Sequence, residues 1–176
     1  MEDGIGFDAS NYGYAVVEKS DMVIDNPKNR PLDQYPRNIV LAAEQYMKDS
    51  GIADTMLILP EFEFHLFDSA GWAVKPGEIS AAVDSAQAPW NSDSEGLGCV
   101  VPHQKNYHIA KPLDRTYECR SEMCLELEKM GIPIKYHHPE VGASGQFEIE
   151  PMLGQMSKMA DATMMIKYVI RNTAMK

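Results

Sequence analysis

The chain has 176 residues, of which 44% are hydrophobic and 24% are charged, and its formal net charge is -10. This length and composition suit one globular domain with a hydrophobic core and exclude a disordered or fibrous chain. The acidic excess opposes binding to a nucleic-acid backbone, which depends on lysine and arginine. It indicates either a solubilising surface or carboxylates gathered to hold cations.

The N-terminal residues and the cysteines bear on the compartment. Residues 1–4 (MEDG) are acidic, and no apolar run approaches the length of a membrane span. The three cysteines have no CxxC spacing, so neither a disulfide framework nor a thiolate zinc site is indicated. We therefore expect a cytoplasmic protein that binds neither membranes nor nucleic acid.

The first elements expected are short strands followed by a helix. Over the first 25 residues, brief apolar pieces alternate with Gly, Asn, Ser and Asp. Residues 25–31 contain two prolines and form a loop or connector. Apolar residues then recur at helical spacing over residues 36–49, with Pro36 near the first turn and Gly51 beyond the end. This pattern predicts a helix over residues 36–49.

Strands are expected in the middle of the chain. Residues 55–67 are too apolar and aromatic for a surface helix and predict a long strand, bent at Pro60. Short strands are expected at residues 72–74 and 79–83. A long loop rich in Ser, Asp, Gly and Pro follows as far as Pro112, and such loops are functional or mobile.

The remaining elements complete the predicted fold. Asp114 can cap a helix that ends before Gly131. Strands are expected at residues 132–138 and 146–150, and a helix with an apolar stripe at residues 155–176. The order of elements predicts an α+β fold with an antiparallel sheet and helices packed on one side.

Two groups of glutamates are candidates for cation binding. Glu61 and Glu63 lie two positions apart in an apolar strand, so they share one face, although such a pair can also be a half-buried strand with its polar face in water. Glu148 and Glu150 share a strand face, and a Gly-Ala-Ser-Gly turn returns Glu140 toward them. If these carboxylates converge, each pair at about 4 Å costs up to roughly 4 kcal/mol at an effective dielectric of 20, and bound cations or protonation must offset this.

The ligand types favour one class of metal. All-oxygen ligation with few nearby thiolates indicates Mg²⁺ or Mn²⁺ rather than zinc. His137 and His138 are strand neighbours that point to opposite faces, so only one of them can approach a metal or substrate at this face. For each, packing or hydrogen bonding is the simpler interpretation.

Several segments of the chain together resemble glutamine synthetase, in the order in which that family has them. The matching segments are residues 7–10 (FDAS), 19–23 (KSDMV), 51–55 (GIADT), 60–64 (PEFEF), 120–125 (RSEMCL) and 137–148. The resemblance implies that residues 1–30 are a remnant of the N-terminal β-grasp domain with its connector. It implies that residues 31–176 are the N-terminal part of the catalytic domain.

The resemblance also implies functional residues. The family's ligands to one metal ion correspond by position to Glu63, Glu140 and Glu148, and Glu61 corresponds to a ligand of a second ion near the ATP phosphates. Asp8 corresponds to the aspartate that a neighbouring subunit lends to the ammonium site. Tyr107 corresponds to a tyrosine close to that site.

The activity that the resemblance implies is ATP-dependent ligation of ammonia to glutamate through a γ-glutamyl phosphate, with Mg²⁺ or Mn²⁺, in a homo-oligomeric ring. The chain departs from the family's pattern: Lys135 stands where many members have a glutamate that contacts ATP, and the C-terminal part that supplies further metal and phosphate ligands is absent. Two hypotheses follow. The chain is a glutamine synthetase by descent that is inactive alone, or a non-catalytic remnant that binds metal or co-assembles with a full-length synthetase.

Overall fold

The computed structural model describes residues 23–25, 30–31, 35–92 and 100–176. The chain divides into two compact units. The first consists of residues 1–60, 125–134 and 151–176, and the second of residues 61–124 and 135–150. The strands expected near the N-terminus before Val23 lie outside the described residues, as does Asp8.

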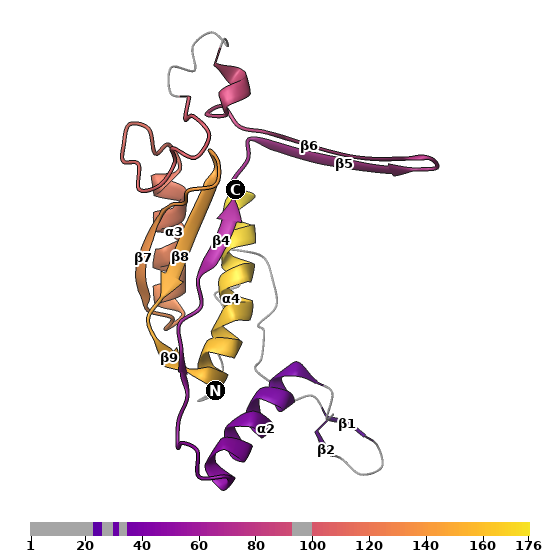
Figure 1. The fold of residues 1–176 in the computed structure, drawn as a ribbon, viewed down its shortest axis with the longest axis vertical. Helices are drawn as coiled ribbons and strands as arrows, with labels where there is room; N and C mark the ends of the chain where they lie inside the picture. The colour runs from indigo at the N-terminus through magenta and orange to yellow at the C-terminus, as the bar shows by residue number, and fades with distance from the viewer. Residues whose placement is uncertain (1–22, 26–29, 32–34, 93–99) are drawn as a thin grey trace. The chain divides into compact units, whose positions relative to one another are not determined.

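The first unit is built around two helices, α2 (Pro36–Asp49) and α4 (Met156–Ala174). Helix α2 has the predicted bounds. The two helices are linked by polar contacts, because the Arg37 guanidinium donates to the Asp161 carboxylate at 2.9 Å and the Glu44 carboxylate accepts from the Ser157 backbone N–H at 2.9 Å. Strands β3 (Leu57–Ile58) and β9 (Gly154–Gln155) pair antiparallel, and so do the short strands β1 (Val23–Asp25) and β2 (Arg30–Pro31) (Figure 1).

Helix α4 supplies the core of this unit. The sequence predicted a helix here, but it placed the buried stripe one position away: of the expected Met156, Met159, Ala160, Thr163, Met164, Lys167 and Ile170, only Met159 and Ile170 are buried, and Met164 is exposed. The buried apolar side chains recur every three or four residues along one helix face. They are Met159, Ala162, Met165, Ile166, Val169 and Ile170. In the described part of the chain, no helix is long and apolar enough to cross a bilayer.

The second unit contains a three-stranded sheet with the order β4-β8-β7. Strand β4 (Phe62–His65) pairs antiparallel with β8 (Gln146–Pro151), so that Glu63 lies opposite Glu148. A short turn joins β7 (Ile134–Pro139) to β8 as a hairpin. Side chains alternate between the faces, so Phe147 and Ile149 are buried on one face while Glu148 and Glu150 lie on the other.

The predicted single strand over residues 55–67 is wrong. The segment forms two strands, β3 and β4, which pair with different partners and belong to different units. The break falls at Pro60, which has no backbone N–H to donate to a ladder. The consequence is that Glu61 lies just before β4 rather than inside a continuous strand.

Helix α3 (Tyr117–Lys129) begins two residues later than a cap at Asp114 would place it. Asp114 does not cap the helix. Its carboxylate accepts two hydrogen bonds from the buried Arg120 guanidinium, at 2.9 and 2.5 Å, because a buried cation needs a counter-charge. The Arg120 guanidinium also lies 4.3 Å from the ring centre of Phe147. The part of α3 that belongs to the second unit therefore packs on the apolar face of the sheet, as expected for the predicted α+β fold.

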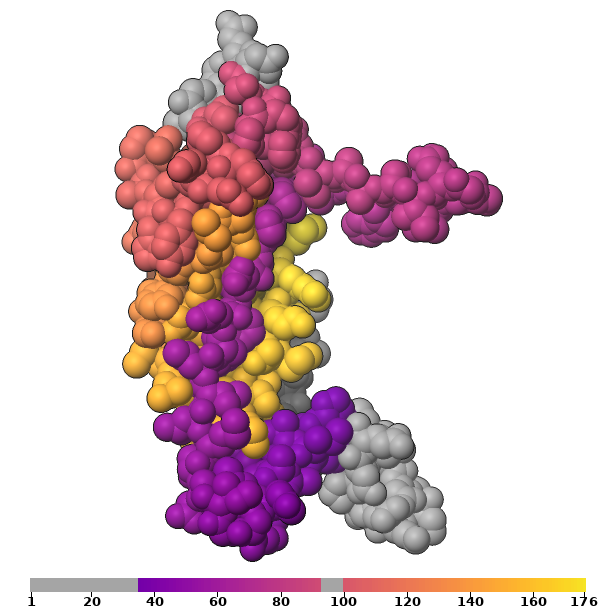
Figure 2. Space-filling model, viewed as in Figure 1, coloured from indigo at the N-terminus to yellow at the C-terminus, as the bar shows by residue number. Residues whose placement is uncertain are grey.

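Strands β5 (Ser69–Lys75) and β6 (Glu78–Asp84) form a separate two-stranded antiparallel hairpin in regular register. The turn between them has Pro76 followed by Gly77 with a φ of +82°, the residue pattern of a type II turn. The hairpin extends away from the sheet of its own unit, and Figure 2 shows its side chains exposed. Both strands were predicted, at residues 72–74 and 79–83, and both extend beyond these bounds.

Candidate metal site

The acidic face of the sheet in the second unit carries the candidate site. Glu148 and Glu150 alternate with buried residues along β8, and Glu63 lies opposite Glu148 on β4. Glu148 is 6% exposed and Glu150 is 1% exposed, so two carboxylates of one strand face are withdrawn from water. Removing carboxylates from water requires partners or cations nearby.

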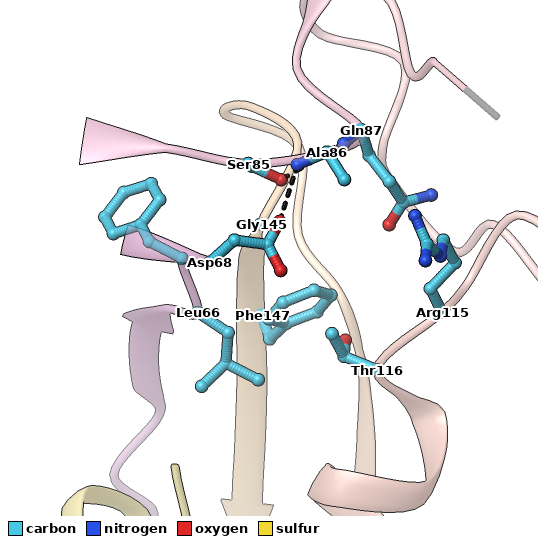
Figure 3. A pocket seen from close by; sticks show the side chains of 10 residues that line it. Leu66, Asp68, Ser85, Ala86, Gln87, Arg115, Thr116, Gly145 and Phe147 are labelled. Atoms are coloured by element: carbon cyan, nitrogen blue, oxygen red, sulfur yellow. Dashed lines mark hydrogen bonds between the residues drawn. The ribbon is translucent and has the colours of Figure 1, made fainter. Parts of the chain in front are cut away.

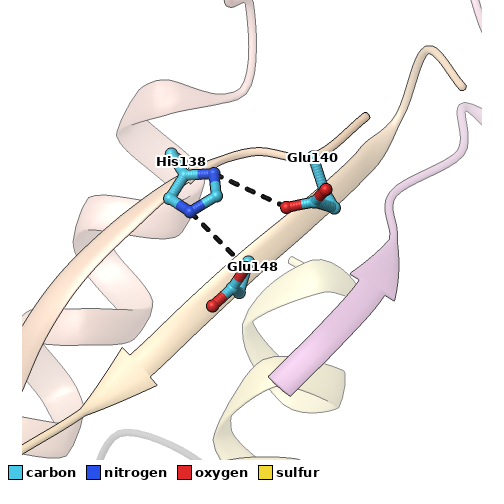
Figure 4. A group of neighbouring side chains, drawn as sticks. All are labelled: His138, Glu140 and Glu148. Atoms are coloured by element: carbon cyan, nitrogen blue, oxygen red, sulfur yellow. Dashed lines mark ion pairs between the residues drawn. The ribbon is translucent and has the colours of Figure 1, made fainter. Parts of the chain in front are cut away.

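The first group of potential ligands consists of His138, Glu140 and Glu148, whose ligand atoms lie within 4.8 Å of one another. Figure 4 shows the His138 imidazole, on β7, with one ring nitrogen toward each of the two carboxylates. The His138 imidazole Nε2 lies 3.4 Å from Glu148 Oε2, and Nδ1 lies 3.9 Å from Glu140 Oε2. One imidazole and two carboxylates form a set that a divalent cation accepts.

The turn between β7 and β8 places Glu140 in this group. Gly145 adopts a φ of +90°, and a Cβ there would lie 2.7 Å from the Leu66 carbonyl oxygen, so only glycine fits without a shift. The buried Asn106 side chain donates from its amide nitrogen to the carbonyl oxygens of Glu140 at 3.0 Å and Gln146 at 2.8 Å. These contacts hold the two ends of the turn together.

The second group consists of Glu61, Glu148 and Glu150, whose ligand atoms also lie within 4.8 Å of one another. Glu148 therefore belongs to both groups. Burial raises the pKa of its carboxyl to about 7, and the charges of Glu61 and Glu140 add to the rise while His138 opposes it. A carboxyl that is partly protonated near neutral pH among other acids is a group that a cation would stabilise in its ionised form.

Glu150 already has two partners. Its Oε1 accepts from the Lys135 ammonium at 2.6 Å, and its Oε2 accepts a short hydrogen bond from the Tyr136 hydroxyl. Burial raises the pKa of the Glu150 carboxyl, but the bonds from Lys135 and Tyr136 outweigh it and hold the pKa below its usual range. The same bond is the main reason that the pKa of Tyr136 rises to about 12. Glu150 is thus ionised and paired.

The remaining residues singled out from the sequence are placed as follows. The carboxylate of Glu63 accepts from the Gln146 side-chain amide at 2.7 Å and belongs to neither ligand group. Tyr107 is exposed, and its ring lies edge-on to His138 with 5.5 Å between ring centres. His108 stacks on the same imidazole at 4.2 Å.

The two adjacent histidines face different surroundings, as strand alternation requires. His137 accepts from Arg120 of α3 at 3.3 Å, and burial lowers its pKa. His137 therefore has a packing and hydrogen-bonding role, which is the simpler interpretation given above, whereas His138 lies next to the carboxylates. Sequence reasoning left His138 out of the ligand set, and the strand alternation with Glu148 across the hairpin was the signal that could have included it.

A small cavity of about 170 Å³ lies elsewhere in the second unit. Figure 3 shows the Asp68 carboxylate accepting the backbone N–H of Ala86 at its rim, with Arg115 and Thr116 across from it. Phe147 lines this cavity, and Phe147 lies on the apolar face of the sheet. The cavity is therefore separate from the acidic face.

The geometry agrees with the relationship that comparison with known proteins reveals. A family model described as the catalytic domain of glutamine synthetase matches residues 33–176. The chain belongs to the glutamine synthetase family. The match contains every described candidate ligand, whereas Asp8 lies before it.

Individual relatives show how the chain compares with members of this family. It is similar to the glutamine synthetase of Pasteurella multocida, with 35% identity over 99% of the chain and 43% of that protein. It is equally similar, at 35% over 99% of the chain, to the 3-hydroxylaminophenol mutase of Cupriavidus pinatubonensis. The cryo-EM structure of Plasmodium falciparum glutamine synthetase resembles it in fold with a TM-score of 0.75, at 20% identity, over 98% of this chain and 40% of that one.

The coverage of these relatives is itself informative. The chain spans less than half of the length of the curated relatives named above. It therefore corresponds to a part of the glutamine synthetase fold that includes the acidic sheet face.

Proposed function

We propose that this chain supplies the carboxylate part of a glutamine synthetase active site, which ligates ammonia to glutamate at the expense of ATP through a γ-glutamyl phosphate. The observation that carries the proposal is the His138–Glu140–Glu148 group. Glu148, which also belongs to the group with Glu61 and Glu150, is buried, and the pKa of its carboxyl is raised to about 7. Such a carboxyl is poised for a cation.

The chemistry of the donors fits Mg²⁺ or Mn²⁺. The groups offer carboxylate oxygens and one imidazole nitrogen, and no cysteine belongs to either group among the described residues. Hard oxygen ligands favour these ions over zinc. A bound divalent ion would neutralise charge on the phosphoryl group that passes from ATP to glutamate.

Within this proposal, the chain's own residues have distinct roles. Glu140 and Glu148 hold the ion, with His138 beside them and Glu63 contributing after release from Gln146. Glu61 contributes to the second group. Tyr107, next to His138, lies beside the position where ammonia is activated, and Asp8 would be lent to the ammonium site of a neighbouring subunit in a homo-oligomer.

We also propose that the chain alone does not make glutamine. It spans less than half of the relatives it matches, and phosphoryl transfer needs cationic groups around the phosphates in addition to carboxylates. The alternative is a non-catalytic metal-binding or co-assembling remnant. The occupation of Glu150 by Lys135 favours this alternative, because it withdraws one carboxylate from the second group.

Two measurements on the purified 176-residue chain test the proposal. Titration calorimetry should show Mn²⁺ binding that Glu148→Ala abolishes and that Glu128→Ala, on the exposed surface of α3, leaves unchanged. An assay with ATP, Mg²⁺, glutamate and ammonia should show no glutamine. Unchanged Mn²⁺ binding in Glu148→Ala would refute the metal site. Glutamine formation by the chain alone would refute the proposal that the chain needs further residues for activity. Restoration of activity on mixing with an inactive full-length synthetase would favour a complementing part over a remnant.

A further inference from the structure

The acidic face presents two ligand groups that share Glu148, and they differ in how many of their carboxylate oxygens already accept hydrogen bonds. In the first group, one oxygen of Glu140 accepts the Val141 backbone N–H at 2.8 Å, and His138 Nδ1 lies 2.9 Å from the Pro139 carbonyl oxygen. The other Glu140 oxygen and Glu148 lie next to the His138 imidazole, which can itself be a ligand through Nε2. In the second group, Glu150 is held through both of its oxygens. One accepts from the Lys135 ammonium, and the other accepts from the Tyr136 hydroxyl.

Lys135 reaches Glu150 because of its place in the sheet. Strand β7 is an end strand in the order β4-β8-β7, and alternation along it directs Lys135 and Tyr136 to opposite faces. A long side chain at an edge strand can pass round the edge, and the Lys135 ammonium lies 4.9 Å from the ring centre of Tyr136. Its side chain is 43% exposed, whereas that of Glu150 is 2% exposed, so the ammonium enters the acidic face from the surface.

We propose that Lys135 is a built-in counter-ion of the Glu61–Glu148–Glu150 group, so that the acidic face takes one divalent cation, at His138–Glu140–Glu148, instead of two. The inference rests on the proposed metal-binding function. Its physical basis is charge and ligand count: the ammonium contributes one positive charge where a cation would sit and occupies a ligand oxygen of Glu150. With Glu150 occupied, only Glu61 and Glu148 remain for a second ion, and Glu148 already serves the first.

The strength of the effect can be bounded from Coulomb's law. A unit charge about 4 Å from a cation, at an effective dielectric of about 20, changes affinity by a factor on the order of a thousand or more. Because the Lys135 side chain is partly exposed, solvent reduces this factor, and we expect a change of about tenfold or more. A change of that size is readily measured.

The test is the Mn²⁺ stoichiometry of the full 176-residue chain, measured by calorimetry and by the electron paramagnetic resonance signal of free Mn²⁺. The wild-type chain should bind one equivalent, and Lys135→Gln should bind two, the second at least about tenfold more tightly than any second ion on the wild type. Lys135→Arg, which keeps the charge, should bind one. The double variant Lys135→Gln with Glu150→Gln should also return to one, because it lacks the freed carboxylate.

The possible results separate this inference from the proposed function. Two equivalents on the wild type, or one on Lys135→Gln, would overturn the inference while leaving the metal site in place. A wild type that binds none would refute the proposed function and, with it, the inference that the acidic face takes one cation, whether or not Lys135→Gln gains an equivalent. Lys135→Gln leaves the charge of Glu150 without its ammonium partner and can lower the melting temperature. The Tm of the variant is therefore also measured as a function of Mn²⁺ concentration. It should rise more steeply than that of the wild type, and an equal slope would count against the inference.

Discussion

Replacing Glu148 by Gln should stabilise the metal-free chain at alkaline pH relative to acidic pH. The reason is the raised pKa of this carboxyl, which burial and the neighbouring carboxylates Glu61 and Glu140 move from 4.5 to about 7. Ionising the group in the folded chain is therefore harder than ionising it in the unfolded chain. Glutamine has the same shape and carries no charge at any of these pH values.

The sign and size follow from proton linkage. Between pH 4.5 and about 7, the folded chain keeps a proton on Glu148 that the unfolded chain has lost, so the free energy of unfolding falls as the pH rises through this window. Above about pH 7 the loss is complete. At 1.36 kcal/mol for each pH unit, its upper limit is about 3 kcal/mol.

Urea denaturation in the presence of a chelator, at about pH 4 and about pH 8, measures the effect. We expect the difference in unfolding free energy between wild type and Glu148→Gln to shift by up to about 3 kcal/mol in favour of the variant between the two pH values. Glu128→Gln, an exposed control on α3, should show no such shift. Parallel pH profiles for wild type and Glu148→Gln would show that Glu148 is ionised freely in the folded chain, and the reasoning about its surroundings would be refuted.

Three further outcomes are expected. The Mn²⁺ affinity of the chain should fall by up to about tenfold for each pH unit below 7, because Glu148 must lose its proton to bind, and an affinity independent of pH in calorimetry would contradict this. Gly145→Ala should lower the free energy of unfolding by about 2 kcal/mol or more and weaken Mn²⁺ binding. Gly77→Ala, also at positive φ but in open space, should lower it by about 1 kcal/mol and leave binding unchanged. Equal effects of the two variants in denaturation and titration would contradict the argument that Gly145 is required by the turn. Arg120→Ala should lower the free energy of unfolding by about 3–5 kcal/mol, because it leaves the buried carboxylate of Asp114 unpaired. Lys111→Ala, which removes an exposed ion pair, should lower it by about 0–1 kcal/mol, and similar melting temperatures for the two variants would contradict this prediction.

The sequence predicted elements well where one pattern determined them. The helices α2 and α4 follow from apolar spacing, although the buried face of α4 is not the predicted one, and the alternation in β8 correctly placed Glu148 and Glu150 on one face. Local patterns decide that these elements form, because the spacing of apolar residues within an element favours a helix or a strand. Which face is buried depends on the partners: in α2 the buried residue is Glu44, whereas Ile39 and Tyr46 are exposed.

The features that were missed depend on distant partners. The run over residues 55–67 is uniformly apolar, and nothing within it shows that its two parts pair with different strands on either side of Pro60. Asp114 looked like a helix cap, yet it serves the buried guanidinium of Arg120, whose burial local sequence does not reveal. Likewise, the roles of Glu150 and His138 depend on which side chains of the neighbouring strand reach them.

Asn106 has a consequence for the lifetime of the site. Its side-chain amide directs both of its hydrogens at carbonyl oxygens, one at each end of the turn that carries Glu140. Hydrolysis of that amide to a carboxylate would replace two donors by an acceptor facing two acceptors, in a position that is 2% exposed. Chemical ageing at this one residue would therefore open the turn without touching a candidate ligand. A stored sample could lose its capacity for metal while every carboxylate of the site stayed intact.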